Sequence, residues 1–206
     1  MEPAESPFRI ILGSSSIARR KILAEMGYEF ALMSADIDEK SIRTEKPEEL
    51  VMALAKAKAD AIVSKLQTSD DQKKDVIPSI LIASDTVVVY DGTIREKPSS
   101  EEEARQFIKD YSGKHAATLS SVFVTNLKTG FTKVDCDKAE IYFHEIPDDV
   151  VEKLIEEGLV LRVAGALIIE HPLVAPYVKN LMGTSDSVMG LPKALTEKLL
   201  KEAVNS

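Results

Sequence analysis

Asp85 is the residue whose surroundings in the sequence most clearly indicate chemistry. It lies inside an apolar, β-branched run at residues 81–89. A carboxylate in such a run is costly to bury unless it is paired, hydrogen-bonded or bound to a metal, and buried carboxylates are common at functional sites. An aspartate at a frayed strand end would instead be solvated. Because the apolar run continues through Val89, we favour a functional Asp85.

Lys58 interrupts an apolar helix face in the same way. On a helical wheel it shares one face with five apolar residues, whereas Lys56 points elsewhere. The five are Leu50, Val51, Leu54, Ala55 and Ile62. The ammonium of Lys58 either extends to solvent at the rim of the helix or reaches an anion beneath it, and the pattern alone leaves both open.

Residues 13–16, Gly-Ser-Ser-Ser, separate a short predicted strand at 8–12 from a predicted helix at 17–26. A helix N-terminus offers unpaired backbone N–H groups and the positive end of the helix dipole, which suit a phosphate. Ser14 and Ser16 add hydroxyl donors, and the guanidinium of Arg19 can form paired hydrogen bonds to phosphate oxygens. The alternative is a serine helix cap followed by solvated arginines. The Gly-Lys-Ser/Thr ending of a P-loop is missing.

Three acidic residues lie close together before the next predicted helix, and they are Asp36, Asp38 and Glu39. Their hard oxygen atoms suit Mg²⁺ or Mn²⁺, although acidic loops are commonly only solvated. Asp36 and Asp38 also form an Asp-x-Asp pair, the nucleophile motif of haloacid-dehalogenase-like phosphatases, but Lys40 stands where that family has threonine or valine. Lys97, just before a further predicted helix, either meets an anion or is a surface lysine.

An α/β fold must position these residues. We expect helices at 47–66, 147–158 and 191–203, and another that begins after Ser99 and Ser100, each followed three residues later by a glutamate. We expect strands at 80–89, 118–126, 131–143 and 163–169, the second and third joined across residues 129–130, and a surface loop at 67–75. Strands that alternate with helices and then form a hairpin predict a mixed sheet flanked by helices.

Composition narrows the class of protein. The 206 residues, 44% of them hydrophobic and 29% charged, suffice for one domain with a sizeable core. A net charge of −8 argues against duplex DNA or a membrane surface as partners. The sequence has no apolar run of about 18 residues that could span a membrane, and its acidic N-terminus lacks signal-peptide features. With Cys136 as the only cysteine, we expect a cytoplasmic protein.

Eight segments, in order from about residue 8 to 200, together resemble the Maf family of nucleotide pyrophosphatases. They are Ile11-Leu12-Gly13-Ser14-Ser15-Ser16 with Arg19-Arg20 and Leu23; Asp38-Glu39; Leu54-Ala55-Lys56-Ala57-Lys58-Ala59; Ser84-Asp85-Thr86-Val87-Val88; Glu96-Lys97-Pro98; Ser112-Gly113; Ala164-Gly165-Ala166; and Val188-Met189-Gly190-Leu191-Pro192. The resemblance implies an elongated α/β fold with a mixed sheet and a cleft between two lobes, a divalent cation (Mg²⁺ or Mn²⁺), and a homodimer. We therefore expect residues 1–206 to form a single Maf-like domain, with residues 1–7 as a disordered tail.

The same resemblance assigns a role to each matching residue. Asp85 would be the general base that activates or orients a water for attack on the α-phosphorus of a nucleoside triphosphate, which yields a monophosphate and pyrophosphate. Glu39, with Asp38 and Asp85, would hold the metal ion. The phosphate chain would be bound by Ser14, Ser16, Arg19, Lys58 and Lys97.

Three positions bear on the choice of base. Thr86 resembles the branch of the family that prefers dTTP and UTP. Glu170 falls where that branch has glutamine and the 7-methyl-GTP branch has glutamate. Ala18 matches neither the arginine nor the tryptophan of these branches, and His171-Pro172 stands where a glycine-rich stretch is expected. The sequence thus leaves the base open, and a nucleotide-sensing module without turnover is the non-enzymatic alternative.

Overall fold

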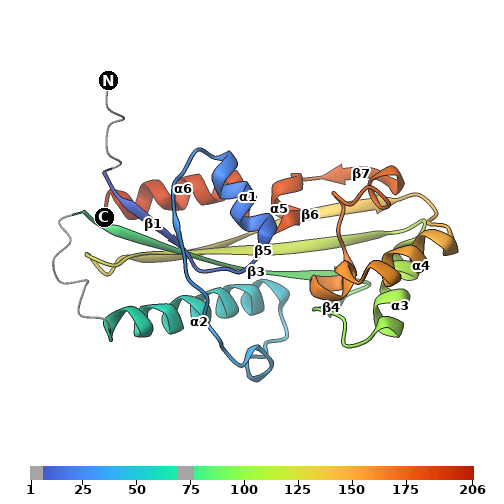
Figure 1. Cartoon of the computed structure of the whole chain (residues 1–206), viewed down its shortest axis with the longest axis horizontal. Coiled ribbons are helices and arrows are strands. Elements are labelled where there is room, and N and C mark those ends of the chain that lie inside the picture. Colours follow the sequence, from blue (N-terminus) through green and yellow to red (C-terminus); the bar gives the residue numbers. More distant parts are fainter. Residues whose placement is uncertain (1–6, 69–76) are drawn as a thin grey trace. The chain divides into compact units, whose positions relative to one another are not determined.

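The computed structural model describes residues 7–68 and 77–206 (Figure 1). All but Pro7 of the predicted tail lies outside these residues, as does the predicted loop after Thr68. The helices and strands are β1 (Arg9–Leu12), α1 (Ile17–Glu25), β2 (Ala31–Leu32), α2 (Pro47–Gln67), β3 (Ser79–Tyr90), β4 (Thr93–Arg95), α3 (Glu101–Tyr111), β5 (His115–Asn126), β6 (Thr132–Phe143), α4 (Asp148–Glu157), β7 (Val178–Met182), α5 (Ser185–Met189) and α6 (Lys193–Val204).

Seven strands of the described residues form one mixed sheet in the order β2-β1-β3-β5-β6-β7, with β4 paired to β3. The pairs β1–β2 and β1–β3 are parallel, whereas β3–β4 and β6–β7 are antiparallel. The predicted mixed sheet with helices is therefore confirmed. Among the described residues no helix is both long and apolar enough to cross a membrane.

The chain divides into two compact units, and three strands contribute residues to both. Unit 1 comprises the described residues up to Asp85, together with Ser121–Cys136 and Gly190–Ser206; unit 2 comprises Thr86–Ser120 and Asp137–Met189.

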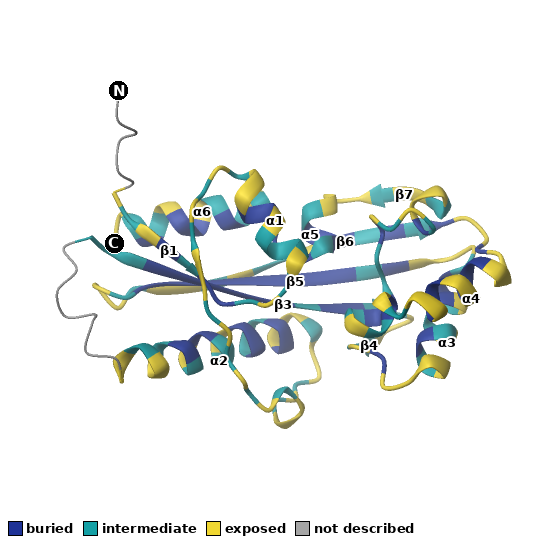
Figure 2. Ribbon diagram, in the orientation of Figure 1, coloured by how far each residue is buried: buried dark blue, intermediate teal, exposed yellow. Residues whose placement is uncertain are grey.

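In unit 1, α2 covers one face of the sheet and α1 and α6 cover the other (Figure 1). Helix α2 begins with proline at its first turn, followed by Glu48 and Glu49, which complement the positive end of the helix dipole. Its inner side is buried, as the dark blue stripe in Figure 2 shows. The predicted apolar face is confirmed, because Leu50, Val51, Leu54, Ala55 and Ile62 are all at most 2% exposed.

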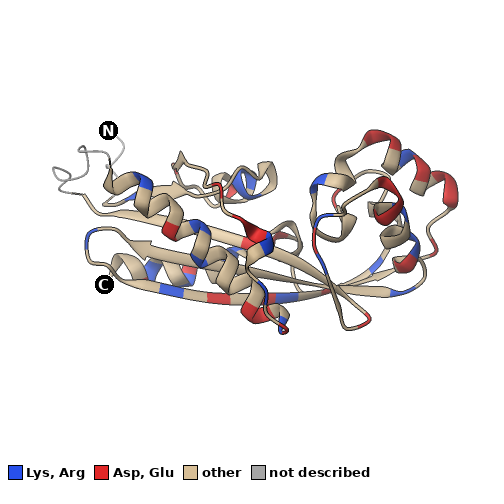
Figure 3. Cartoon of the chain, turned by 90° about the horizontal axis from the view of Figure 1, so that it is seen from below, with Lys and Arg blue, Asp and Glu red and all other residues tan. Residues whose placement is uncertain are grey.

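In unit 2, α3 and α4 pack on an apolar core around Tyr111, whose ring lies edge-on to Tyr90 and is stacked on Phe143. The Tyr111 hydroxyl donates to the carbonyl of Gly165 at 2.7 Å. Acidic residues gather in the first turns of α3 and α4, where they complement the helix dipoles, and Figure 3 shows basic and acidic residues interspersed elsewhere.

The strand expected at 163–169 is wrong. A short 3-10 helix, Ala164–Ala166, lies in this region directly after another, Leu159–Arg162, and no residue of 163–169 is in a strand. Gly165 has a φ of 63°, and a Cβ there would lie 2.6 Å from atoms of Val88, so the backbone turns tightly against the core instead of extending. Ala166 and Ile169 are buried and the other apolar residues of the region are partly buried, a pattern that does not distinguish a strand from such a turn.

The capping residues before α3 also differ in part from the expectation. Ser100 caps the helix, because its Oγ accepts the N–H of Glu103 at 3.1 Å. Ser99 contacts the side chain of Glu103, whereas Glu102 pairs with Arg105. One glutamate therefore serves both serines.

Candidate active site

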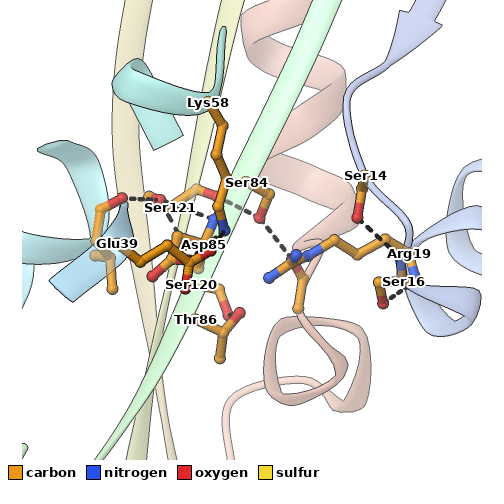
Figure 4. A network of polar contacts seen from close by, with 12 residues as sticks. Ser14, Ser16, Arg19, Glu39, Lys58, Ser84, Asp85, Thr86, Ser120 and Ser121 are labelled. Carbon is orange, nitrogen blue, oxygen red and sulfur yellow. Dashed lines mark hydrogen bonds and ion pairs between the residues drawn. The ribbon is translucent and has the colours of Figure 1, made fainter. Parts of the chain in front are cut away.

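Asp85, Lys58 and Glu39 form the centre of a charged cluster in unit 1 (Figure 4). The Lys58 ammonium donates to Asp85 Oδ1 at 2.6 Å and lies 3.3 Å from Glu39 Oε1. The Lys58 side chain is 17% exposed and that of Asp85 is 10% exposed. Lys58 therefore reaches an anion beneath its helix, and it bridges two carboxylates. Lys56, two residues earlier, is exposed and pairs with Asp60, as the helical wheel predicted.

Burial raises the pKa of the Asp85 carboxyl above its ordinary value, and the nearby negative charge of Glu39 acts in the same direction. Lys58 and Arg19 partly oppose this increase because each cation favours the ionised carboxylate. Burial likewise lowers the pKa of Arg19, with Asp85 and Glu39 acting against it. A guanidinium nevertheless remains protonated in proteins. The cluster is thus electrostatically coupled from α1 through β3 to α2.

Ser16 caps the start of α1, and Ser14 stabilises the turn before it. Ser16 Oγ accepts the N–H of Arg19 at 3.3 Å, and Ser14 Oγ accepts the N–H of Ser16 at 3.1 Å. Within the part of the chain that the structure describes, neither hydroxyl donates a hydrogen bond. A hydroxyl has one proton besides its lone pairs, so each serine can accept its backbone N–H and still donate to a phosphate. The two interpretations of this segment are compatible.

Arg19 is anchored by a residue from the other end of the sequence. Its Nε donates to the carbonyl of Gly190 at 2.9 Å. Ser84 Oγ lies 2.8 Å from the same carbonyl oxygen and 2.6 Å from the carbonyl of Ser121. The segment around Gly190 therefore connects α1, which carries Arg19, to β3, which carries Asp85.

Ser121 is a residue that the sequence analysis missed. Its Oγ accepts the N–H of Asp85 at 3.2 Å and donates to the carbonyl of Val51 in α2 at 2.6 Å. It is fully buried. The available signal was the polar pair Ser120-Ser121 inside an otherwise apolar strand, because buried hydroxyls need partners.

Thr86, Lys97 and Glu170 are candidate residues that belong to unit 2. Thr86 Oγ1 is 2.9 Å from Ser120 Oγ, which in turn donates to the carbonyl of Ser187. Lys97 and Glu170 are exposed. Ala18, in unit 1, lies half-buried on α1.

The candidate metal ligands are brought together only in part. Glu39 and Asp85 share Lys58, whereas Asp38 is exposed. No group of three or more His, Cys, Asp or Glu residues in the described chain is arranged to hold a metal ion. Two carboxylates do fit Mg²⁺, which commonly binds one or two carboxylates together with substrate phosphates.

Comparison with known proteins places these residues in a family context. A sequence model described as "Maf-like protein" matches residues 9–203. A 7-methyl-GTP pyrophosphatase of Dictyostelium discoideum is 41% identical over 195 residues, which cover 94% of this chain and 96% of that protein. A dTTP/UTP pyrophosphatase of Agathobacter rectalis is 31% identical over 204 residues (96% and 98% coverage), and one of Thermotoga maritima is 34% identical over 194 residues (94% and 89%).

Proposed function

Because this chain belongs to the Maf-like protein family, we propose that it is a nucleoside triphosphate pyrophosphatase, which releases pyrophosphate and leaves a nucleoside monophosphate. The relatives above, similar over nearly their whole length, are named as pyrophosphatases of nucleoside triphosphates. One structural observation carries the proposal: Asp85 is a buried carboxylate that contacts Lys58 directly, and the positive charge of Arg19 favours its ionised form. Such a cluster suits reaction at a phosphate, where positioning and electrostatics dominate catalysis.

In the proposed reaction a water molecule attacks the α-phosphorus while Asp85 accepts its proton. The bond between the α-phosphorus and the bridging oxygen to the β-phosphorus breaks, and pyrophosphate leaves with that oxygen. The raised pKa of Asp85 suits this role, because a general base is most effective when its pKa approaches the working pH.

The cations and hydroxyls of unit 1 supply the phosphate contacts. Arg19 can form paired hydrogen bonds to phosphate oxygens, and Ser14 and Ser16 can donate their hydroxyl protons. Lys58 neutralises charge that develops near Asp85. We assign Lys97 of unit 2 to the same phosphate chain on the basis of its family motif, Glu96-Lys97-Pro98.

A divalent cation, Mg²⁺ or Mn²⁺, would supply further neutralisation of the phosphate charge. Glu39 and Asp85 are the residues that would hold it, because both carboxylates face the Lys58 ammonium. Asp38 is a weaker candidate, since it is exposed. In the absence of substrate, Lys58 already supplies one positive charge between the two carboxylates.

For the base we propose 7-methylguanine. Two observations support it: the relative that is 41% identical is a 7-methyl-GTP pyrophosphatase, and Glu170 is an exposed carboxylate. A carboxylate can accept hydrogen bonds from the N–H groups of guanine and complements the positive charge of the methylated ring. Thr86 instead favours thymine or uracil as the base, since it resembles the dTTP/UTP branch.

The two alternatives have less support. A phosphatase that uses Asp36 as nucleophile would need a strand directly before it, but β2 ends at Leu32 and both Asp36 and Asp38 are exposed. A module that binds nucleotide without turnover has no support in the names of the relatives, which are those of enzymes.

The test is a product assay on the purified chain with Mg²⁺ or Mn²⁺. Pyrophosphate and orthophosphate are measured separately for 7-methyl-GTP, GTP, UTP, dTTP and CTP. We expect pyrophosphate, fastest from 7-methyl-GTP, and a loss of about 10²- to 10⁴-fold in Asp85→Asn. Asp60→Asn, an exposed aspartate paired with Lys56, is the control and should keep full activity. Orthophosphate as the first product, or equal rates in Asp85→Asn and wild type, would refute the mechanism.

A further inference from the structure

We infer that Ser121 is a positioning residue for the proposed reaction: its hydroxyl holds the backbone of Asp85 against the helix that carries Lys58. The inference rests on the proposed function for its catalytic consequence. The structural basis of the inference does not depend on the substrate, because it consists of three contacts that the Ser121 hydroxyl makes within unit 1. Those contacts join β5, β3 and α2.

The hydrogen-bonding capacity of the Ser121 hydroxyl determines which groups it can join. Ser121 Oγ has a single proton and two lone pairs. The proton is directed to the carbonyl of Val51, at 2.6 Å, and a lone pair accepts the N–H of Asp85, at 3.2 Å. The contact with the carbonyl of Asp85 is longer, at 3.4 Å. The hydroxyl therefore links β3 to α2 directly.

The position of the Val51 contact relative to Lys58 determines how the two together constrain α2. Val51 precedes Lys58 by seven residues, about two helical turns, so both lie on the same face of α2. Ser121 thus fixes α2 at one point and the Lys58–Asp85 ion pair fixes it at another, two turns further on. With both points in place, the helix is constrained in both position and rotation relative to Asp85.

The burial of Ser121 determines what the loss of its hydroxyl would cost. Ser121 is fully buried, so water cannot replace its hydroxyl if the side chain is truncated. Its loss leaves the Asp85 N–H without this partner and lets the aspartate shift. A displacement of about 1 Å at a reacting group can cost about 10²-fold in rate, so a small movement here would be visible in turnover.

The test compares four substitutions in the full chain. Ser121→Ala removes the hydroxyl, Ser121→Cys replaces it with a weaker donor of similar size, and Ser121→Thr retains it. Thr196→Val is the matched control, because Thr196 is also fully buried in unit 1 and donates to a backbone carbonyl, that of Pro192 at 2.7 Å, but has no contact with Asp85. Each variant is measured for the free energy of unfolding and for kcat and KM of pyrophosphate release.

We expect kcat to fall about 10- to 100-fold in Ser121→Ala with KM changed less than about twofold, less in Ser121→Cys, and to recover largely in Ser121→Thr. Thr196→Val should lose stability and keep its kcat. If Ser121→Ala does not fold, the comparison of Cys with Thr decides. Equal loss of stability in Ser121→Ala and Thr196→Val with unchanged kcat would overturn the inference.

A spectroscopic measurement separates this inference from the proposed function. The ammonium of Lys58 can be observed by NMR in lysine-¹⁵N-labelled protein and assigned by its loss in Lys58→Met. In Ser121→Ala its resonance should shift or broaden, and in Ser121→Thr it should return, whether or not the protein turns over any nucleotide. An unchanged Lys58 resonance in Ser121→Ala would overturn the positioning role. Absence of pyrophosphate from the wild type would instead refute the proposed function.

Discussion

Lys58 in unit 1 and Arg95 in unit 2 are both cations largely withdrawn from water, but their surroundings differ. Lys58 meets two carboxylates, Asp85 and Glu39. Arg95 meets one carboxylate, Asp110, and lies 4.4 Å from the ring centroids of both Tyr90 and Phe107. Lys58 thus lies in a cluster of two carboxylates and two cations, since Arg19 also acts on Asp85, whereas Arg95 pairs with one carboxylate and is enclosed by aromatic rings.

This difference is the one expected between a residue of a candidate site and a residue of a structural core. A charge whose partners balance it and whose other neighbours are apolar contributes to stability, in part through contact with aromatic faces. A cation that lies among other charged groups at a partly exposed position, as Lys58 does, can also interact with a charged ligand. We therefore expect Lys58 to serve function and Arg95 to serve the fold, so that removing the first should act on turnover and removing the second on stability.

Lys58→Met should have the largest effect, and it should act on turnover. We expect the rate of pyrophosphate release to fall about 10²- to 10³-fold, the usual effect of removing one preorganised charge-stabilising group. The protein should stay folded. Lys56→Met is the control, because Lys56 is exposed and its pair with Asp60 contributes about 0–1 kcal/mol. Similar rates in the two variants would show that Lys58 is no more important to turnover than an exposed lysine.

Arg95→Met should act on stability instead. Breaking a buried ion pair costs about 3–5 kcal/mol, and we expect about 2–3 kcal/mol here because the Asp110 side chain is 24% exposed. Chemical denaturation measures this loss. Arg105→Met, on the surface of α3 and paired with Glu152, should lose much less. At a temperature where Arg95→Met is folded, its kcat should match the wild type, and a severe loss of kcat would show that Arg95 is more than a core residue.

The pH dependence should give the smallest but most specific signal. Turnover requires the ionised Asp85, so kcat/KM falls as the pH drops through its pKa. Glu39 raises this pKa and Lys58 lowers it. The acidic limb of the profile should therefore move to lower pH in Glu39→Gln and to higher pH in Lys58→Met, measured on the residual activity. Shifts in the same direction would contradict the assignment of Asp85 as the base.

Asp85 and Lys58 could be predicted from the sequence because charges on apolar elements carry a free-energy cost that must be offset. The assignments of Lys97 and Glu170 stay predictions that rest on family motifs alone, since an exposed charge costs little wherever it lies. Ser121 and the carbonyl of Gly190 were missed because their partners are backbone atoms far away in the sequence. The apolar run at 163–169 was misassigned because its burial does not depend on whether the backbone extends or turns.

The hydrogen bonds to the carbonyl of Gly190 also have a consequence for synthesis on the ribosome. Arg19 and Ser84 precede their acceptor by 171 and 106 positions, and bacterial and eukaryotic ribosomes add about 5–20 residues per second. Both stretches of unit 2 are therefore translated before this acceptor exists. A nascent chain can form the aromatic core around Arg95 first, while Arg19, which we propose as a phosphate ligand, gains its bond to Gly190 only when the C-terminal segment emerges.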